Sequence, residues 1–277
     1  MLGSVAAAHA QTVYSNNYAP GDYFTNAGSS AANQVVNGVQ GGGPEQVTYR
    51  ETKNNGTVGI NTNLPRSGNG SAWFSTVGTA NGKSEIALST GFSAAGDSTG
   101  VLGQFDDMTA FGADLYTQSS PDSGNQSPIL RLELYSPTDG GGRYGQLVFD
   151  TAWTPSHYGT FDYNQWNTVD LLTNAGSMWM RATSGINTAY DPGTGDNHER
   201  TLADWMTVLG GKNYSVISVN AGIGTFNGSF EGAMDNLSIG FNGDNHVYNF
   251  EAVPEPASVC ALGLGALALL RRKRTKK

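Results

Sequence analysis

The stretch ILRLELY, residues 129–135, alternates apolar and polar side chains with a period of two. Successive side chains of a β-strand point to opposite faces, so the leucines share one face and the polar residues share the other. The apolar face holds Leu130, Leu132 and Leu134, and the polar face holds Arg131, Glu133 and Tyr135. The pattern predicts a half-buried strand whose polar face meets either water or a ligand.

Short segments with strand-like composition recur along the chain, separated by clusters of Gly, Asn, Ser and Pro. We expect strands at 46–50, 57–60, 71–77, 84–89, 108–116, 144–150, 166–172, 177–183, 215–220, 226–234, 236–241 and 246–251. Short strands at this spacing indicate an all-β fold, either a sandwich or a barrel. The longest irregular stretch is expected before residue 71.

One short helix is expected, over residues 199–209. Leu202, Trp205, Met206 and Leu209 recur there at helical spacing, and two glycines at 210 and 211 end the pattern.

The segment GSFEGAMDNLSIG (228–240), followed by HVYNFE (246–251), resembles the final strands of concanavalin-like jelly-roll modules. In that family an Asp-Asn pair precedes the last core strand, and Asp235 and Asn236 occupy its place. The resemblance implies a single antiparallel jelly-roll β-sandwich, concanavalin A-like, over residues 11–252.

The net charge of the chain is −8, from 23 acidic and 15 basic residues. Six of the basic residues lie in the last seven positions, so the remainder carries a net charge of about −14. Binding to nucleic acid needs clustered Lys and Arg, so this composition argues against a nucleic-acid partner.

The C-terminal residues 253–277 have three parts in order. A short motif, Val253, Pro254, Glu255 and Pro256, precedes an apolar segment at 257–270. The basic end contains Arg271, Arg272, Lys273 and Arg274. We expect a single transmembrane helix at 257–270, although its length of about 21 Å is short of the bilayer core of about 30 Å. The basic end predicts that the rest of the chain lies outside the cytoplasm.

This tail resembles the PEP-CTERM sorting signal of Gram-negative bacteria. The resemblance implies an exosortase-like membrane protease as a partner, anchoring in the inner membrane before processing, and then a cell-surface or extracellular location. At the other end, Ala8, His9 and Ala10 match a small-x-small cleavage pattern. We therefore interpret residues 1–10 as a signal-peptide remnant, with Gln11 as the new N-terminus.

A structural calcium ion is the cofactor that the sequence suggests. The loop 191–199 offers Asp191, Asp196, Asn197 and Glu199, whose oxygen atoms are the type of ligand that calcium takes. Asp235 with Glu251 is a second candidate, by analogy to jelly-roll calcium sites. Loops rich in Asp, Asn and Gly also form ordinary turns, and this alternative stays open.

Aromatic side chains that stack on sugar rings are a further candidate site. Trp153, Tyr158 and Tyr163 lie close together in sequence, beside residues that could hydrogen-bond to hydroxyl groups. Trp166 begins a strand and is expected in the core.

Catalytic motifs are scarce in this sequence. It has no pair of carboxylates in an E-x-D-x-x-E string, no G-x-S-x-G and no H-E-x-x-H. We predict a non-enzymatic, exported surface or matrix protein associated with exopolysaccharide or biofilm. The alternatives are a carbohydrate-binding module and, less favoured, a polysaccharide hydrolase or lyase that uses Glu133 or Glu231.

Overall fold

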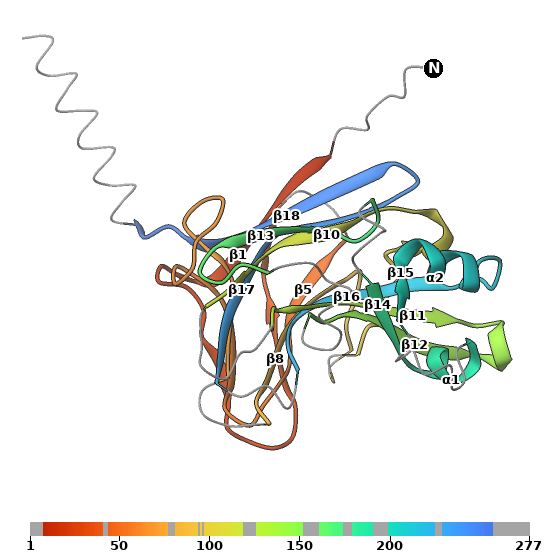
Figure 1. Cartoon of the computed structure of the whole chain (residues 1–277). Helices are drawn as coiled ribbons and strands as arrows, with labels where there is room; N and C mark the ends of the chain where they lie inside the picture. Colours follow the sequence, from red (N-terminus) through yellow and green to blue (C-terminus); the bar gives the residue numbers. More distant parts are fainter. Residues whose placement is uncertain are drawn as a thin grey trace, which may run out of the picture.

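Two β-sheets packed against each other form the body of the protein in this computed structural model (Figure 1). The structure describes residues 8–40, 44–76, 81–93, 95, 97–118, 126–151, 161–173, 179–190, 199–224 and 229–256. The expected all-β jelly-roll sandwich is confirmed, with one departure from antiparallel pairing at the N-terminal strand.

The first sheet, sheet A, is built around the long strand β17 (Phe230–Phe241). On one side β17 pairs with β10, and β10 with β13; on the other it pairs with β7 along its first half and with β18 along its second. Beyond these lie β6 and β2 on the β7 side, and β1 and β4 on the β18 side. Their bounds are β13 Trp166–Asp170, β10 Met108–Thr117, β7 Ser71–Thr76, β18 Asp244–Val253, β6 Gly56–Asn61, β2 Phe24–Asn26, β1 His9–Tyr18 and β4 Gly38–Gln40.

The second sheet, sheet B, runs in the order β15, β14, β12, β11, β16, β8, β5 and β3, with β9 beside β16. Their bounds are β15 Glu199–Thr201, β14 Trp179–Ser184, β12 Arg143–Phe149, β11 Ile129–Ser136, β16 Ser215–Ile223, β8 Lys83–Ser89, β5 Gln46–Lys53, β3 Ala32–Val36 and β9 Gly103–Gln104. Two short helices, α1 (Gly185–Tyr190) and α2 (Leu202–Leu209), lie at the β12–β14–β15 end (Figure 1), and 3₁₀ turns occupy Phe105–Asp107 and Asp139–Gly141.

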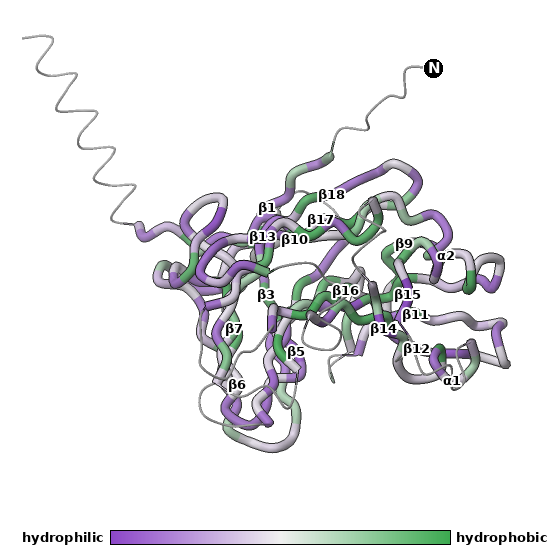
Figure 2. Tube along the Cα trace, in the orientation of Figure 1, coloured by the Kyte–Doolittle hydropathy of each residue, from purple (hydrophilic) through white to green (hydrophobic). Residues whose placement is uncertain are grey.

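The core fills the space between the sheets. Leu130, Leu132 and Leu134 of β11 are completely buried, as the alternating pattern predicts. Hydrophobic positions recur along the strands of both layers, whereas the connecting loops are mostly hydrophilic (Figure 2). At about 25 cal/mol per Å² of apolar surface, these faces supply most of the favourable free energy of folding.

The strands expected at 226–234 and 236–241 are one strand, β17. The register of its pairing with β10 shifts between Gly112 and Asp114, and Asn236 takes a left-handed backbone conformation with φ of 50°. A β-bulge therefore lies where the sequence indicated a break, because an extra residue can be absorbed without ending the strand.

The expected helix at 199–209 is shorter than predicted. Its first three residues form strand β15, and the helix α2 begins after Thr201. The Thr201 hydroxyl oxygen accepts a hydrogen bond from the Asp204 N–H at 3.1 Å, which is the usual capping arrangement at a helix start. A second helix, α1, was not expected; Ile186 anchors it in the core with no exposed surface.

The N-terminal region is also more regular than predicted, because strands β1 to β6 precede residue 71. Strand β1 runs parallel to β18, and Val13 is completely buried. Strand β18 continues to Val253, so the sandwich includes the first residue of the expected sorting motif.

In the described part of the chain, none of the helices has the length and hydrophobicity that spanning a bilayer requires. The helix expected at 257–270 and the basic residues Arg271, Arg272, Lys273 and Arg274 lie outside the described residues.

Candidate functional site

The predicted sugar-binding aromatics are only partly within the described chain. Trp153 and Tyr158 lie outside it. Tyr163 is half-buried in the turn before β13, and its buried hydroxyl has no hydrogen-bond partner. Its role in binding stays a prediction.

The loop expected to bind calcium is likewise only partly described. Asp191, Asp196 and Asn197 lie outside the described residues, whereas Glu199 is buried in β15, opposite Arg181 of β14. Within the described part, no group of three or more His, Cys, Asp or Glu side chains is arranged to hold a metal ion.

Asp235 and Glu251, the second calcium candidate, hold a loop in this structure. Asp235 Oδ2 accepts the Ser67 N–H at 3.2 Å and Oδ1 accepts the Phe250 N–H at 2.9 Å. Glu251 Oε2 accepts the Asn69 N–H at 2.6 Å. Both carboxylates therefore fix the backbone of the loop 62–70, and amide hydrogens occupy the oxygen atoms that a cation would need. Calcium binding there stays a prediction.

Burial raises the pKa of Asp235 to about 6, although three backbone N–H groups favour its charged form. The nearby Glu251 carboxylate adds to the increase. The Asp235 side chain has no exposed surface.

A row of aromatic side chains crosses the outer face of sheet A. Trp73 on β7 lies opposite Ala233 on β17, Ala233 lies opposite Tyr116 on β10, and Tyr116 lies opposite Trp166 on β13. The inward neighbours of these residues form the core, so all four side chains share the outer face. Tyr23 extends the row beyond Trp73.

The rings of this row are close but not coplanar. The centroids of Tyr116 and Trp166 are 5.5 Å apart with an interplanar angle of 56°. Those of Tyr23 and Trp73 are 5.8 Å apart at 64°. Trp73 and Tyr116 stand two strands apart, about 10 Å, with only the small Ala233 between them. Trp166 is thus a half-exposed member of this surface, and its predicted place in the core was wrong.

Polar groups border the row at its Trp166 end. The Arg66 guanidinium lies 5.9 Å from the Trp166 ring centroid, and its Nε donates to Asp114 Oδ2 at 3.2 Å. The same oxygen accepts from Asn236 Nδ2 at 2.8 Å, and Asp114 Oδ1 accepts from the Thr168 hydroxyl at 2.6 Å. The Arg66 side chain remains 40% exposed, so its terminal nitrogens can donate to a bound hydroxyl group.

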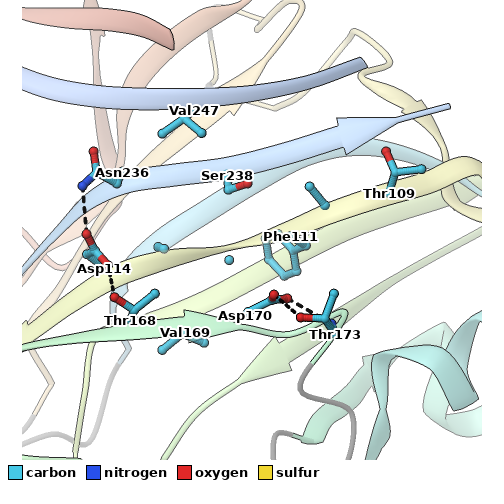
Figure 3. Close-up of a pocket in the computed structure, with 13 residues that line it drawn as sticks. Thr109, Phe111, Asp114, Thr168, Val169, Asp170, Thr173, Asn236, Ser238 and Val247 are labelled. Carbon is cyan, nitrogen blue, oxygen red and sulfur yellow. Dashed lines mark hydrogen bonds between the residues drawn. The ribbon is translucent and has the colours of Figure 1, made fainter. Parts of the chain in front are cut away.

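A groove of about 310 Å³ continues from this cluster along β10, β13 and β17 (Figure 3). Its floor is low because Ala110, Gly112 and Ser238 carry small side chains or none. Asp170 and Thr173 lie on one side and Val247 on the other (Figure 3). The row and the groove together form a continuous outer surface of aromatic, hydroxyl, amide and carboxylate groups.

The outer face of sheet B carries a different arrangement, a network of buried ion pairs. Arg131 on β11 donates to both oxygens of Glu85 on β8, with Nη1 to Oε1 at 3.0 Å. Lys83 Nζ lies 3.1 Å from Glu85 Oε1, and Arg50 Nη1 donates to Glu133 Oε1 at 2.9 Å. The expected polar face of ILRLELY therefore exists, but Arg131 and Glu133 face other charges and are almost completely buried.

This network keeps the Glu85 carboxylate charged. Burial alone would raise the pKa of Glu85, but Arg131 and Lys83 hold that pKa below its ordinary value. Tyr135 and Tyr144, opposite each other at one end of this face, remain 41% and 39% exposed.

The aromatic row could have been predicted from the sequence, by asking which residues share a face within each strand. In SAWFST, Trp73 shares its face with Ser71 and Ser75, whereas Phe74 shares the other with Ala72. Trp166 likewise shares a face with Thr168 and Asp170. An aromatic residue on the polar face of a strand points away from the core, so the sequence alone indicates that Trp73 and Trp166 face outward.

Comparison with known protein families gives a match at the end of the chain. Residues 252–274 match the family described as the PEP-CTERM protein-sorting motif. The protein carries a PEP-CTERM sorting motif. The motif marks an exported protein that is anchored in the membrane by its tail before processing and then reaches the cell surface. The predicted sorting signal and location are thus confirmed.

The remaining comparisons concern the whole chain. No curated protein matches it. Among solved structures, it is similar to a family 11 carbohydrate-binding module from Clostridium thermocellum, in complex with a β-1,3-1,4-mixed-linked tetrasaccharide, at 13% sequence identity and a TM-score of 0.33. The similarity covers 82% of this chain and 91% of the other.

Proposed function

We propose that this PEP-CTERM protein binds polysaccharide through the outer face of sheet A and acts without catalysis. The observation that carries the proposal is the row formed in register by Trp73, Ala233, Tyr116 and Trp166. Sugar rings present apolar C–H faces and equatorial hydroxyl groups. Aromatic rings with hydrogen-bonding groups beside them match both features.

The geometry narrows the class of ligand. Because neighbouring rings are inclined by 56° and 64°, a flat crystalline surface would not contact them all, whereas a single twisted chain can. The distance of about 10 Å between Trp73 and Tyr116 suits contacts with separate sugar units of such a chain. The strongly negative charge of the domain would repel uronic-acid polymers. A soluble, neutral polysaccharide of the cell's own matrix is therefore the proposed ligand.

The electrostatics support a non-catalytic role. A glycosidase needs one carboxyl group that stays protonated and reaches the glycosidic oxygen. Among the described residues, Glu85 has a lowered pKa, and Asp235, whose pKa is raised, is enclosed by backbone amides. Glu231, an acid suggested by the sequence, accepts a hydrogen bond from Trp73 Nε1 at 2.8 Å and so orients the aromatic row.

Calorimetry and affinity electrophoresis with a panel of neutral and acidic polysaccharides test this proposal. Tyr116→Ala and Trp166→Ala should each weaken binding of a neutral polysaccharide about tenfold or more, because each removes an aromatic anchor. Tyr144→Ala is the matched control, since it removes an exposed aromatic side chain from sheet B. Binding that survives both sheet A substitutions, or no binding to any neutral polysaccharide, would refute the proposal.

A further inference from the structure

The aromatic row and the groove run in different directions over sheet A. The row crosses the strands, because Trp73, Tyr116 and Trp166 stand at matched register positions on their strands. The groove instead follows the strands, from Asp114 toward Thr109 along β10 (Figure 3). Pairing between antiparallel strands is perpendicular to the strands, so the row and the groove meet close to a right angle.

The junction of the two features lies at Asp114. Thr168, which donates to Asp114 Oδ1 at 2.6 Å, lies on the same strand and the same face as Trp166 of the row. Asn236, which donates to Asp114 Oδ2 at 2.8 Å, lines the groove. A linear chain that lies along the row therefore passes the mouth of the groove without filling it.

The groove has room for a small ligand. Its volume of about 310 Å³ is at the lower end of the range for small-molecule sites, about 300–1,000 Å³. Ala110 and Ser238 keep the floor low. Gly112 lies between them, and a Cβ at this position would come within 2.2 Å of the Val169 carbonyl oxygen. The packing of β10 against β13 therefore requires a glycine in this floor.

Two carboxylates line the groove and keep capacity for a ligand. Asp170 Oδ1 accepts the N–H groups of Leu172 and Thr173 at 3.1 and 3.0 Å, and Oδ2 accepts the Thr173 hydroxyl. A carboxylate can accept about four hydrogen bonds, and Asp114 and Asp170 each accept three from the described residues. These bonds orient both carboxylates in advance, which favours binding of a hydroxyl group. An acidic sugar would be repelled.

We infer, on the basis of the proposed function, that the bound polysaccharide is branched and that the groove holds a single neutral sugar attached to the chain on the aromatic row. A branch leaves its main chain sideways, as the groove leaves the row. Val247 offers an apolar wall to the C–H groups of that sugar, and Asp114 and Asp170 accept from its hydroxyl groups. Ser238 determines the specificity, because its small side chain leaves the space that the branch occupies.

Calorimetry with matched pairs of soluble neutral oligosaccharides tests this inference. The members of each pair share a main chain: cellotetraose with the xyloglucan heptasaccharide, mannopentaose with its singly galactosylated form, and laminarihexaose with its singly glucosylated form. Where the main chain fits the row, the wild-type protein should bind the branched member about tenfold more tightly. Ser238→Leu should remove this preference and leave the affinity for the linear member unchanged, because the row stays intact.

Ala110→Leu narrows the same floor from β10 and is a second, independent variant. Ser215→Leu, on β16 of the other sheet, is the control and should keep the wild-type preference. The inference is overturned, and the proposed function stands, if the wild type binds both members equally, or if both groove variants keep the preference or lose both members alike. Absence of binding to all these oligosaccharides overturns the inference too, whereas the proposed function falls only if the wider polysaccharide panel also shows no binding.

Discussion

Removing Arg131 should destabilise the protein strongly, because it leaves Glu85 charged and completely buried. Only Lys83, at 3.1 Å, would remain as a partner of that carboxylate. Breaking a buried ion pair from one side typically costs about 3–5 kcal/mol. In a domain of this size Arg131→Met should therefore lower the melting temperature by about 6–20 °C.

Double substitution separates the cost of an unpaired charge from that of lost packing. Combining Arg131→Met with Glu85→Gln leaves no unpaired buried charge at this pair, so about 1–3 kcal/mol of the loss should return. Urea unfolding followed by tryptophan fluorescence measures both free energies of unfolding. Arg143→Met removes a pair with Asp139 that is only partly buried, with side chains 27% and 16% exposed, and as the control it should have a smaller effect.

The pH dependence of the unfolding free energy should change sign in Arg131→Met. In the wild type, cations hold the pKa of Glu85 below its ordinary value, so its contribution to stability is present at neutral pH and is lost as the pH falls below about 4.5. In Arg131→Met, burial prevails, the pKa of Glu85 rises, and acidification from pH 7 should increase stability. A loss below about 1 kcal/mol, or a double variant no more stable than the single one, would refute this reasoning.

Asp235→Asn should remove the contribution of the Asp235 carboxyl group to the pH dependence of stability. The Asp235 pKa of about 6 exceeds its value in the unfolded chain, so this group makes the wild-type protein more stable as the pH falls from 7 to 4, by up to about 3 kcal/mol. The variant should lack this increase; parallel curves of unfolding free energy against pH for the two proteins would contradict the prediction. Leu132→Ala should cost about 2–5 kcal/mol in chemical unfolding, against less than about 1 for the exposed Tyr135→Ala; equal losses would contradict the assignment of faces. Trp205→Phe removes the Nε1–H bond to the Met180 carbonyl and should cost about 1–3 kcal/mol in the same assay; an unchanged free energy would show that this bond contributes nothing.

The strand pattern was predictable wherever one face of a strand meets the core. Leu130, Leu132 and Leu134 alternate because the inner side of sheet B excludes water, and the sequence records that requirement directly. The parallel strand His9–Tyr18 was missed because its first two residues also fit a signal-peptide cleavage pattern. Its partner, β18, lies more than 230 residues away, and no local signal shows such a pairing.

Sites that depend on register were harder to predict than strands. Tyr116 and Trp166 are 50 positions apart in sequence and meet only because β10 pairs with β13. Asp235 resembled a calcium ligand in composition, but its actual partners are backbone N–H groups, which are the same in every sequence. The tail was easier to predict, because its three parts are contiguous in sequence and can be recognised without knowing the fold.

Because the first strand pairs with the last, sheet A can be completed only late in export. Strand β4 pairs with β1, and β1 pairs with β18, so these two early strands find their places only after the chain as far as Val253 has crossed the membrane. Until then the edge of β17 that will receive β18 is open to other chains. Sheet A is therefore completed only when β18, the last strand before the sorting motif, has arrived between β17 and β1.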